Sequence, residues 1–313
     1  MIGYTLQRLL ATVPVLALIG VITFGILHLA PGDPAAVLLG DAASPEETAE
    51  LRKKMGLDRP IYLQFGKWAS QVIRGDLGKS VFSGQPVIQA ISDRLEPTLA
   101  LSIFSMIMSI LIAIPLGVLA AWRANTWIDR GSMVLSVLGF SIPAFWLGVN
   151  LIFFFGVKTR LLPVMGYSPL ADGFRPFLEH LILPSVTLGL VHAALIARMT
   201  RASMLEILRE DYIRTARAKG LRERAVLLRH ALKNAAISIV TIVGLSFAGL
   251  IAGVVVTETV FAIPGVGRLI VEAVLHRDYP IIQGALLMIG AMYVFINLAV
   301  DLLYTWFDPR VKY

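Results

Sequence analysis

Long apolar stretches alternate with polar segments along the whole chain. Six of these stretches are long enough to cross about 30 Å of hydrocarbon as helices. Lipid offers no water to the backbone amides, so each crossing segment must satisfy its own hydrogen bonds, as a helix does. The pattern therefore predicts an all-α integral membrane protein with six transmembrane helices. The predicted spans are Leu9–Ala30, Thr98–Ala121, Gly131–Val157, Leu181–Ala197, Ala235–Thr257 and Ile281–Thr305.

Prolines interrupt three of the spans, and the first span begins like a signal peptide. Pro115, Pro143 and Pro184 lie inside or near the ends of spans, where we expect them to kink a helix rather than abolish it. The first apolar run follows Arg8, is longer than a signal-peptide core, and has no small-x-small cleavage site after Leu29. We therefore expect an uncleaved first span.

Composition agrees with a membrane protein. The 313 residues are 57% hydrophobic and 16% charged, whereas a soluble domain carries about 25% charged residues. The net charge of +7 is compatible with nucleic acid or with a membrane surface. The distribution of the charges favours contact with membrane lipid and no nucleic-acid partner. The absence of cysteine excludes disulfides and thiolate metal sites.

The polar segments divide into two sets that lie on opposite sides of the membrane. Residues 1–8, 122–130, 198–234 and 306–313 carry roughly twice as many Lys and Arg per residue as the other set. The positive-inside rule assigns the more basic set, including both termini, to the cytoplasm. The predicted organisation is an N-terminus and first span (1–30), an extracytoplasmic helical subdomain (31–97), a five-helix core (98–305) and a cytoplasmic tail (306–313).

The long segment 31–97 contains three predicted short helices. Ser44 reads as an N-cap before proline and two glutamates, and Gly56 as the stop of that helix. A second helix ends near Gly75, and a third is expected over Pro86–Leu95. Their apolar residues are expected to pack against each other or against the spans. These residues are Ile61, Phe65, Trp68 and Val72 in the second helix, and Val87, Ile88, Ile91 and Leu95 in the third.

Motifs for chemistry are weak in this chain. Gly75–Ser80 has two residues between its glycines rather than the four of a phosphate-binding loop, and Gly265-Val266-Gly267 lacks the third glycine of a dinucleotide site. We interpret the latter as a turn. The five histidines have no metal-ligand spacing, and no GxSxG motif occurs. We therefore expect no catalytic residue, no metal site and no enzyme activity in this chain.

Four ionisable residues lie in or near the spans. Charged groups inside a membrane usually face a bundle interior or a water-filled path. Arg198 and Glu258 lie at the ends of predicted spans, so we expect both at the membrane interface. Asp301 can reach the headgroup level. His192 is the one candidate for a pore-lining residue.

The basic loop 198–234 is too long for a turn and too polar for lipid. Leu205, Leu208, Tyr212 and Thr215 follow helical spacing, and Gly220 permits a sharp change of direction before a second helix that starts near Arg222. The loop can lie on anionic lipid as an amphipathic hairpin. Alternatively, a short helix projects from the membrane and docks another protein, with small residues allowing close approach.

This loop resembles that of the membrane subunits of binding-protein-dependent ABC importers. Their pattern is Glu-Ala-Ala, three residues, Gly, nine residues, then Ile-x-Leu-Pro. Here Ala216, Gly220 and Leu232 match, and the other positions do not. More specific is the resemblance to the dipeptide/oligopeptide/nickel permease family, and to the first of its two paired permeases. It is carried by residues 31–34 (PGDP), 56–60 (GLDRP), 75–78 (GDLG), 211–220 (DYIRTARAKG), 258–261 (ETVF), 264–267 (PGVG) and 277–280 (RDYP).

The resemblance implies a permease subunit of an importer in the bacterial inner membrane. Such a chain pairs with a second homologous permease, receives substrate from an extracytoplasmic binding protein, and docks on two ATPase subunits. It binds no cofactor itself, because ATP and Mg²⁺ belong to the ATPases. The resemblance assigns the ATPase contact, or coupling helix, to Asp211, Tyr212, Arg214, Thr215, Ala216, Arg217, Lys219, Gly220 and Leu221.

A second hypothesis is a self-contained secondary transporter driven by ions through His192 and Asp301. It predicts internal inverted repeats, and no clear repeat is visible. An intramembrane enzyme lacks a catalytic constellation. Within the resembling family the transported solutes include dipeptides, oligopeptides, glutathione, opines and chelated nickel, so the resemblance leaves the substrate open.

Overall fold

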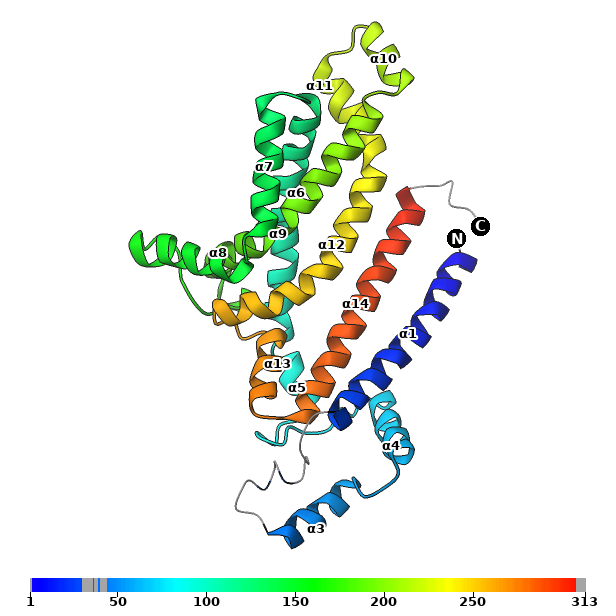
Figure 1. Ribbon diagram of the computed structural model, residues 1–313, viewed down its shortest axis with the longest axis vertical. Coiled ribbons are helices and arrows are strands. Elements are labelled where there is room, and N and C mark those ends of the chain that lie inside the picture. Colours follow the sequence, from blue (N-terminus) through cyan, green and yellow to red (C-terminus); the bar gives the residue numbers. More distant parts are fainter. Residues whose placement is uncertain (1, 30–35, 37–38, 40–43, 308–313) are drawn as a thin grey trace. The chain divides into compact units, whose positions relative to one another are not determined.

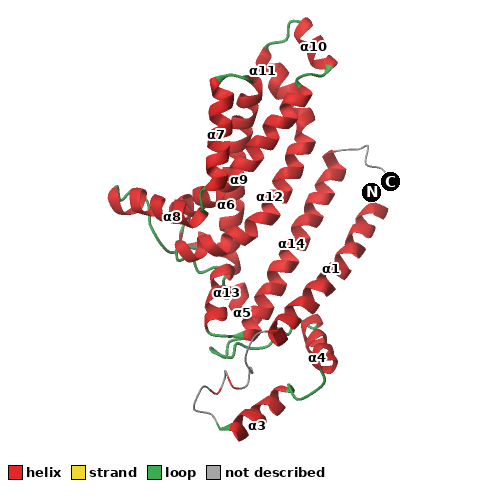
Figure 2. Cartoon of the chain, in the orientation of Figure 1, coloured by secondary structure: helices red, strands yellow, loops and turns green. Residues whose placement is uncertain are grey.

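The computed structural model describes residues 2–29, 36, 39 and 44–307, which fold as helices joined by loops (Figure 1). Figure 2 shows no strand in this part of the chain, and a single isolated antiparallel bridge joins Lys79 and Pro86. The predicted all-α class is therefore confirmed. Two compact units are present. The N-terminal unit comprises Leu6–Glu96 and Gly265–Val294, and the core unit comprises Met1–Thr5, Pro97–Pro264 and Phe295–Tyr313.

The N-terminal unit is built from one long helix, several short ones and the first half of another long helix. Ser44 and Glu47 form a reciprocal capping box, with Glu47 N–H donating to Ser44 Oγ at 3.2 Å and Ser44 N–H donating to Glu47 Oε2 at 2.9 Å. Gly56 ends that helix with φ of 72°. Both predicted boundaries are confirmed. The helices are α1 (Ile2–Leu29), α3 (Pro45–Met55), α4 (Ile61–Ile73), α5 (Val87–Ser92), α13 (Val266–Leu275) and α14 (Tyr279–Phe307).

The apolar stripe of α4 packs against α1. The Phe24 ring of α1 lies 5.3 Å from the Phe65 ring and 5.4 Å from the Trp68 ring, measured between centroids. Ile61 was also expected in this contact, and that prediction is wrong, because its side chain is 54% exposed at the first turn of α4. Helical spacing therefore identified the contact face at Phe65 and Trp68 but not at the first turn of the helix.

A cluster of α5, α13 and α14 forms the apolar core of the N-terminal unit. Val87 and Ile91 are fully buried there, beside Val266 of α13. The expectation that Ile88 packs with them is wrong, because its side chain is 46% exposed. The interpretation of 265–267 as a turn is also corrected. Gly265 is the N-cap of α13, and the two residues after it form its first turn.

The core unit holds the remaining helices. Figure 1 shows α9 running beside α12, with α7 along another side of α9. The elements are α6 (Leu95–Trp122), α7 (Trp127–Ser141), α8 (Ala144–Leu151), η1 (Ile152–Lys158), η2 (Leu170–Asp172), α9 (Phe174–Ile207), α10 (Asp211–Ala218), α11 (Glu223–Ala225), η3 (Val226–Ala231) and α12 (Leu232–Val260). η1 and η3 are π-helical segments and η2 is a 3₁₀ turn.

The predicted third span is broken rather than kinked. Within the described residues, five helices are long and apolar enough to cross a membrane, or six if the bent pair of α7 with α8 and η1 counts as one span. The bend in that pair is 99°. Ile142, which precedes Pro143, is extended with ψ of 124°, because the proline ring disfavours helical geometry in the residue before it. Pro115 and Pro184 lie inside continuous helices, as predicted.

Small residues allow the core helices to approach closely. A Cβ at Gly117 of α6 would lie 2.6 Å from Thr200 Cβ of α9, and one at Gly189 would lie 2.9 Å from the Ser105 carbonyl oxygen. Ser109 Oγ donates to the Gly189 carbonyl at 2.8 Å. Without a hydrophobic driving force between helices in lipid, close packing and such hydrogen bonds hold a bundle together. They fix α9 against α6 and thereby position the site at its end.

Candidate functional site

The predicted interaction loop is a compact helical hairpin at one end of the core unit. The long helix α9 continues ten residues past Ala197 to Ile207. The short helix α10 follows, and α11 with η3 leads the chain back into α12. Figure 1 shows α10 beyond the ends of α9 and α12. The hairpin therefore presents a helix outside the bundle, joined at both ends to long core helices.

One face of α10 packs against the hairpin itself. Ile213 is fully buried and Ala216 is 7% exposed, in a cluster with Val226 and Leu227 of η3 and with Met204 of α9. The side chain of Ala216 is small because the returning segment lies close to it. The resemblance assigned Ala216 to the contact with an ATPase subunit, whereas in this chain its side chain faces the interior of the hairpin.

The end of α10 is a tight left-handed turn. Gly220 has φ of 75°, a conformation that costs a residue with a Cβ. Its N–H donates to the Arg217 carbonyl at 2.9 Å, and the Leu221 N–H donates to the Ala216 carbonyl at 3.3 Å. This pair of bonds is the Schellman motif, which satisfies the last carbonyls of a helix. The predicted change of direction at Gly220 is confirmed.

Polar contacts hold the two arms of the hairpin together. Arg217 donates to both oxygens of Glu223, from Nη2 at 2.7 Å and from Nε at 3.2 Å. The hydrogen bonds that Arg217 donates to Glu223 raise the pKa of Arg217 above its ordinary value. Asn234 Nδ2 donates to the Tyr212 hydroxyl at 2.9 Å, so Tyr212 is tied to the start of α12. These contacts make the hairpin a rigid extension of α9 and α12.

The opposite face of α10 is exposed and mainly basic. Arg214 and Asp211 form a local ion pair at 2.8 Å with both side chains largely in solvent. Lys219 and Leu221 are exposed at the turn, and Arg222 and Arg224 follow. Of the nine predicted contact residues, eight lie on the exposed surface of one hairpin, and Ala216 alone is buried. Such a basic, stiff projection suits a partner with an acidic groove.

An ion pair at the same end of the core unit was missed by the sequence reading. Arg201 Nη2 of α9 donates to Asp129 Oδ2 of α7 at 2.7 Å, and Arg201 Nε donates to the other carboxylate oxygen. The Asn125 N–H donates to Asp129 Oδ2 at 2.9 Å. The Asp129 side chain is 5% exposed. The pair joins α7 and the loop before it to the part of α9 that leads into the hairpin.

The expectation that the Glu258 side chain reaches out to the membrane interface is wrong. Its side chain is completely buried in the core unit, and Thr98 Oγ1 donates to Glu258 Oε1 at 2.6 Å. Glu258 does lie near the end of α12, which ends at Val260, but the start of α6 covers its carboxylate. A buried carboxylate needs such a donor, because an unpaired one is costly to dehydrate.

Arg198 lies within α9, which continues nine residues beyond it, and its position at the membrane interface stays a prediction. It lines a pocket between α7 and α9. His192 is half-buried, and its Cε1 lies 4.0 Å from the position of a Cβ at Gly249 of α12. Its role as a pore-lining residue stays a prediction. The side chain of Asp301 and the motif at residues 31–34 lie outside the described residues.

No group of three or more His, Asp or Glu side chains in the described part of the chain could hold a metal ion.

The fold and the hairpin together define a multi-span membrane protein with a projecting helix that is stiffly joined to its core. Two family models cover most of the chain. The model described as "binding-protein-dependent transport system inner membrane component" matches residues 113–313, and the model of the N-terminal part of such a component matches residues 1–102. The chain belongs to this family of inner-membrane transport components.

Named relatives match over the full length. A "probable peptide ABC transporter permease protein" of Sinorhizobium fredii is 52% identical, with 99% of each chain covered. The "dipeptide transport system permease protein" of Alkalihalophilus pseudofirmus is 42% identical, with 100% of each covered. The "glutathione transport system permease protein" of Escherichia coli is 44% identical, again with 100% of each covered.

A solved structure shares the fold. The inward-facing MetNI methionine ABC transporter aligns with a TM-score of 0.59 and 21% identity, and the alignment covers 71% of this chain and 97% of that one. At this identity the likeness concerns the fold alone.

Proposed function

We propose that this chain is a permease subunit of an ATP-driven importer for peptides and forms half of the translocation pore. Family membership supports a transport component rather than an enzyme. The peptide substrate is supported by the names of full-length relatives at 42% and 52% identity. The second half of the pore would be a homologous permease, and an extracytoplasmic binding protein would deliver the substrate.

In the orientation that we propose, the hairpin and both termini lie in the cytoplasm. The support is the density of Lys and Arg in residues 198–234 and the other segments assigned to the same side. In this orientation the hairpin reaches the compartment that supplies ATP. The two ATPase subunits bind ATP and Mg²⁺, and this chain takes up their movement through the exposed face of α10.

The geometry of the hairpin is the observation that carries this mechanism. Its inner face is closed by Ile213 and Ala216, and its arms are tied by Arg217 with Glu223. A movement of α10 is therefore transmitted to α9 and α12 rather than lost in a flexible loop. The exposed Arg214 and Lys219 would pair with acidic groups of the ATPase groove.

Charge reversal on the exposed face tests the docking. The variant Arg214→Glu/Lys219→Glu leaves the buried face unchanged, so we expect normal insertion in the membrane. The ATPase subunits should be lost in pull-down from detergent, and ATP-dependent peptide uptake in vesicles should fall by about tenfold or more, which corresponds to roughly 1.4 kcal/mol of lost contact.

Lys53→Glu on α3 is the matched control, because Lys53 is also an exposed cation and lies outside the hairpin. It should keep both ATPase binding and uptake. Wild-type pull-down and uptake in the hairpin variant would overturn the docking proposal. Ala216 is unsuitable for this test, because a larger side chain there would overpack the hairpin itself.

A further inference from the structure

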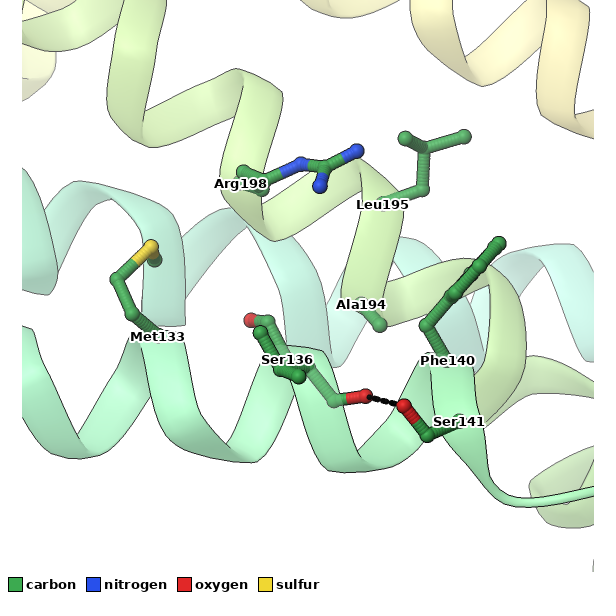
Figure 3. Close-up of a pocket in the computed structure, with 8 residues that line it drawn as sticks. Met133, Ser136, Phe140, Ser141, Ala194, Leu195 and Arg198 are labelled. Atoms are coloured by element: carbon green, nitrogen blue, oxygen red, sulfur yellow. Dashed lines mark hydrogen bonds between the residues drawn. The ribbon is translucent and has the colours of Figure 1, made fainter.

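A pocket of about 160 Å³ lies between α7 and α9 in the core unit. Its walls are mainly apolar, with Met133, Val137 and Phe140 from α7 and Leu195 from α9. Figure 3 shows these two helices on either side of the pocket and the Arg198 side chain above it. Arg198 is the charged residue in the lining. The pocket therefore combines apolar walls with one guanidinium group.

The guanidinium is directed toward the middle of α9. In Figure 3 it extends from the Arg198 backbone toward Leu195, which lies nearer the start of the helix. Long helical side chains usually lean toward the helix N-terminus in this way. The group thus points away from the end of α9 that continues into the hairpin. An arginine that reached for headgroups beside the hairpin would point the other way.

Arg198 has no carboxylate of its own. Among the described side chains it makes no ion pair, and the nearby Asp129 is already bound by Arg201 through both oxygens. The serine hydroxyls of the pocket are also occupied. Ser136 Oγ donates to the Ser132 carbonyl at 2.9 Å, and Ser141 Oγ donates to the Val137 carbonyl at 2.8 Å. The guanidinium is the group that remains for an external anion.

The position of Arg198 along α9 is informative. It precedes Arg201 by one turn, and Arg201 pairs with Asp129 in a segment that the proposed orientation assigns to the cytoplasmic side. An arginine near the end of a span faces a bundle interior, a water-filled path or the headgroups rather than the acyl chains. Arg198 is exposed and its guanidinium points away from the hairpin, so the pocket would open to the cytoplasmic end of the path that the transported solute takes.

We propose that this pocket binds a carboxylate of the peptide during its passage, a proposal that rests on the proposed function. A guanidinium matches a carboxylate with two parallel hydrogen bonds. Sites for whole ligands have about 300–1,000 Å³, so a pocket of about 160 Å³ suits one terminal residue with its side chain against Val137 and Phe140. The C-terminal carboxylate is common to unmodified peptides of any sequence, so one arginine can serve many of them.

The transport test uses two labelled peptides that differ only in a C-terminal carboxylate or amide. The complete complex is reconstituted in vesicles, and each variant is compared with wild type for the same peptide, so any preference of the binding protein cancels. We expect Arg198→Gln to lower the maximal rate for the free acid by about tenfold and that for the amide by less than about twofold. Arg198→Lys should be intermediate, because it keeps the charge and loses the planar fork.

Arg130→Gln is the matched control. Arg130 is an exposed arginine of α7 that lies over the Trp127 ring at 5.7 Å and is not part of the pocket. Its loss should change neither rate. A second series in vesicles with and without anionic lipid identifies a lipid site. The proposal would be overturned if the transport defect of Arg198→Gln depended on anionic lipid, or if it were equal for both peptides.

A binding test separates this proposal from the proposed function. The purified complex without its binding protein is titrated with the same two peptides. Wild type should bind the free acid about tenfold more tightly than the amide, and Arg198→Gln should bind both equally. If ATP drives no uptake in wild type, the proposed function fails, while a carboxylate preference that requires Arg198 still supports the pocket. Equal binding of both peptides by wild type would overturn the proposal that the pocket binds a carboxylate.

Discussion

Two arginines one turn apart on α9 have opposite surroundings. Arg201 donates two hydrogen bonds to the buried Asp129, and its side chain is 25% exposed. Arg198 lies in the pocket between the same two helices and has no ion pair among the described side chains. The residue type and the helix are the same at both positions. The partner on α7 decides whether the charge holds the fold together or remains available to a ligand.

This difference also separates stability from transport. Removing one member of a buried pair leaves an unpaired charge, whereas removing an exposed charge costs the fold little. Arg201 joins α7 to the region that leads into the hairpin, so we expect its loss to damage the fold of the core unit. Arg198 should instead affect which solutes pass.

The largest expected effect is that of Asp129→Ala. It leaves the Arg201 guanidinium without its carboxylate and removes the acceptor for the Asn125 N–H. We expect the free energy of unfolding to fall by about 3 kcal/mol, the lower end for breaking a buried pair. Unfolding of the purified chain in detergent, followed by circular dichroism, measures this loss.

The double variant Asp129→Leu/Arg201→Met is the control for this prediction. It removes both charges and keeps much of the volume, so it should lose clearly less stability than Asp129→Ala. If both variants were equally destabilised, the effect would come from packing rather than from the charge pair. An unchanged Asp129→Ala protein would remove the contrast between the two arginines.

The smallest expected effect on stability is that of Arg198→Gln. The side chain is exposed and has no ion pair in the described structure, so the free energy of unfolding should change by less than about 0.5 kcal/mol. The same unfolding measurement, with Arg201→Gln beside it, checks the comparison. An equal loss in the two variants would show that Arg198 also supports the fold.

The apolar pattern predicted most of the fold because lipid leaves little choice of secondary structure. The predicted spans match α6, α12 and α14 within a few residues, whereas α1 begins earlier than predicted and α9 is longer at both ends. The third span differs. A proline can kink a helix or end it, and the choice depends on whether neighbours support the backbone. Pro115 and Pro143 look alike in the sequence, yet the first lies inside α6 and the second separates α7 from α8.

The direction of individual side chains was harder to predict than the elements. Ala216 and Gly220 were correctly placed on a hairpin, but the returning segment η3 is what covers Ala216, and no local signal shows this. Glu258 was placed at the interface because it is near a span end. Its burial depends on Thr98, which is 160 residues earlier in the chain. The Asp129–Arg201 pair likewise joins residues 72 positions apart.

Measuring which energy source drives uptake tests the proposed ATP-driven import most directly. Vesicles containing the complete complex should take up a labelled dipeptide only when ATP is present on the side of the ATPase subunits and the binding protein is on the other. Vesicles containing this chain alone should show no uptake in a proton or sodium gradient. Gradient-driven uptake by the chain alone, without ATP or ATPases, would contradict the account and identify an ion-coupled transporter.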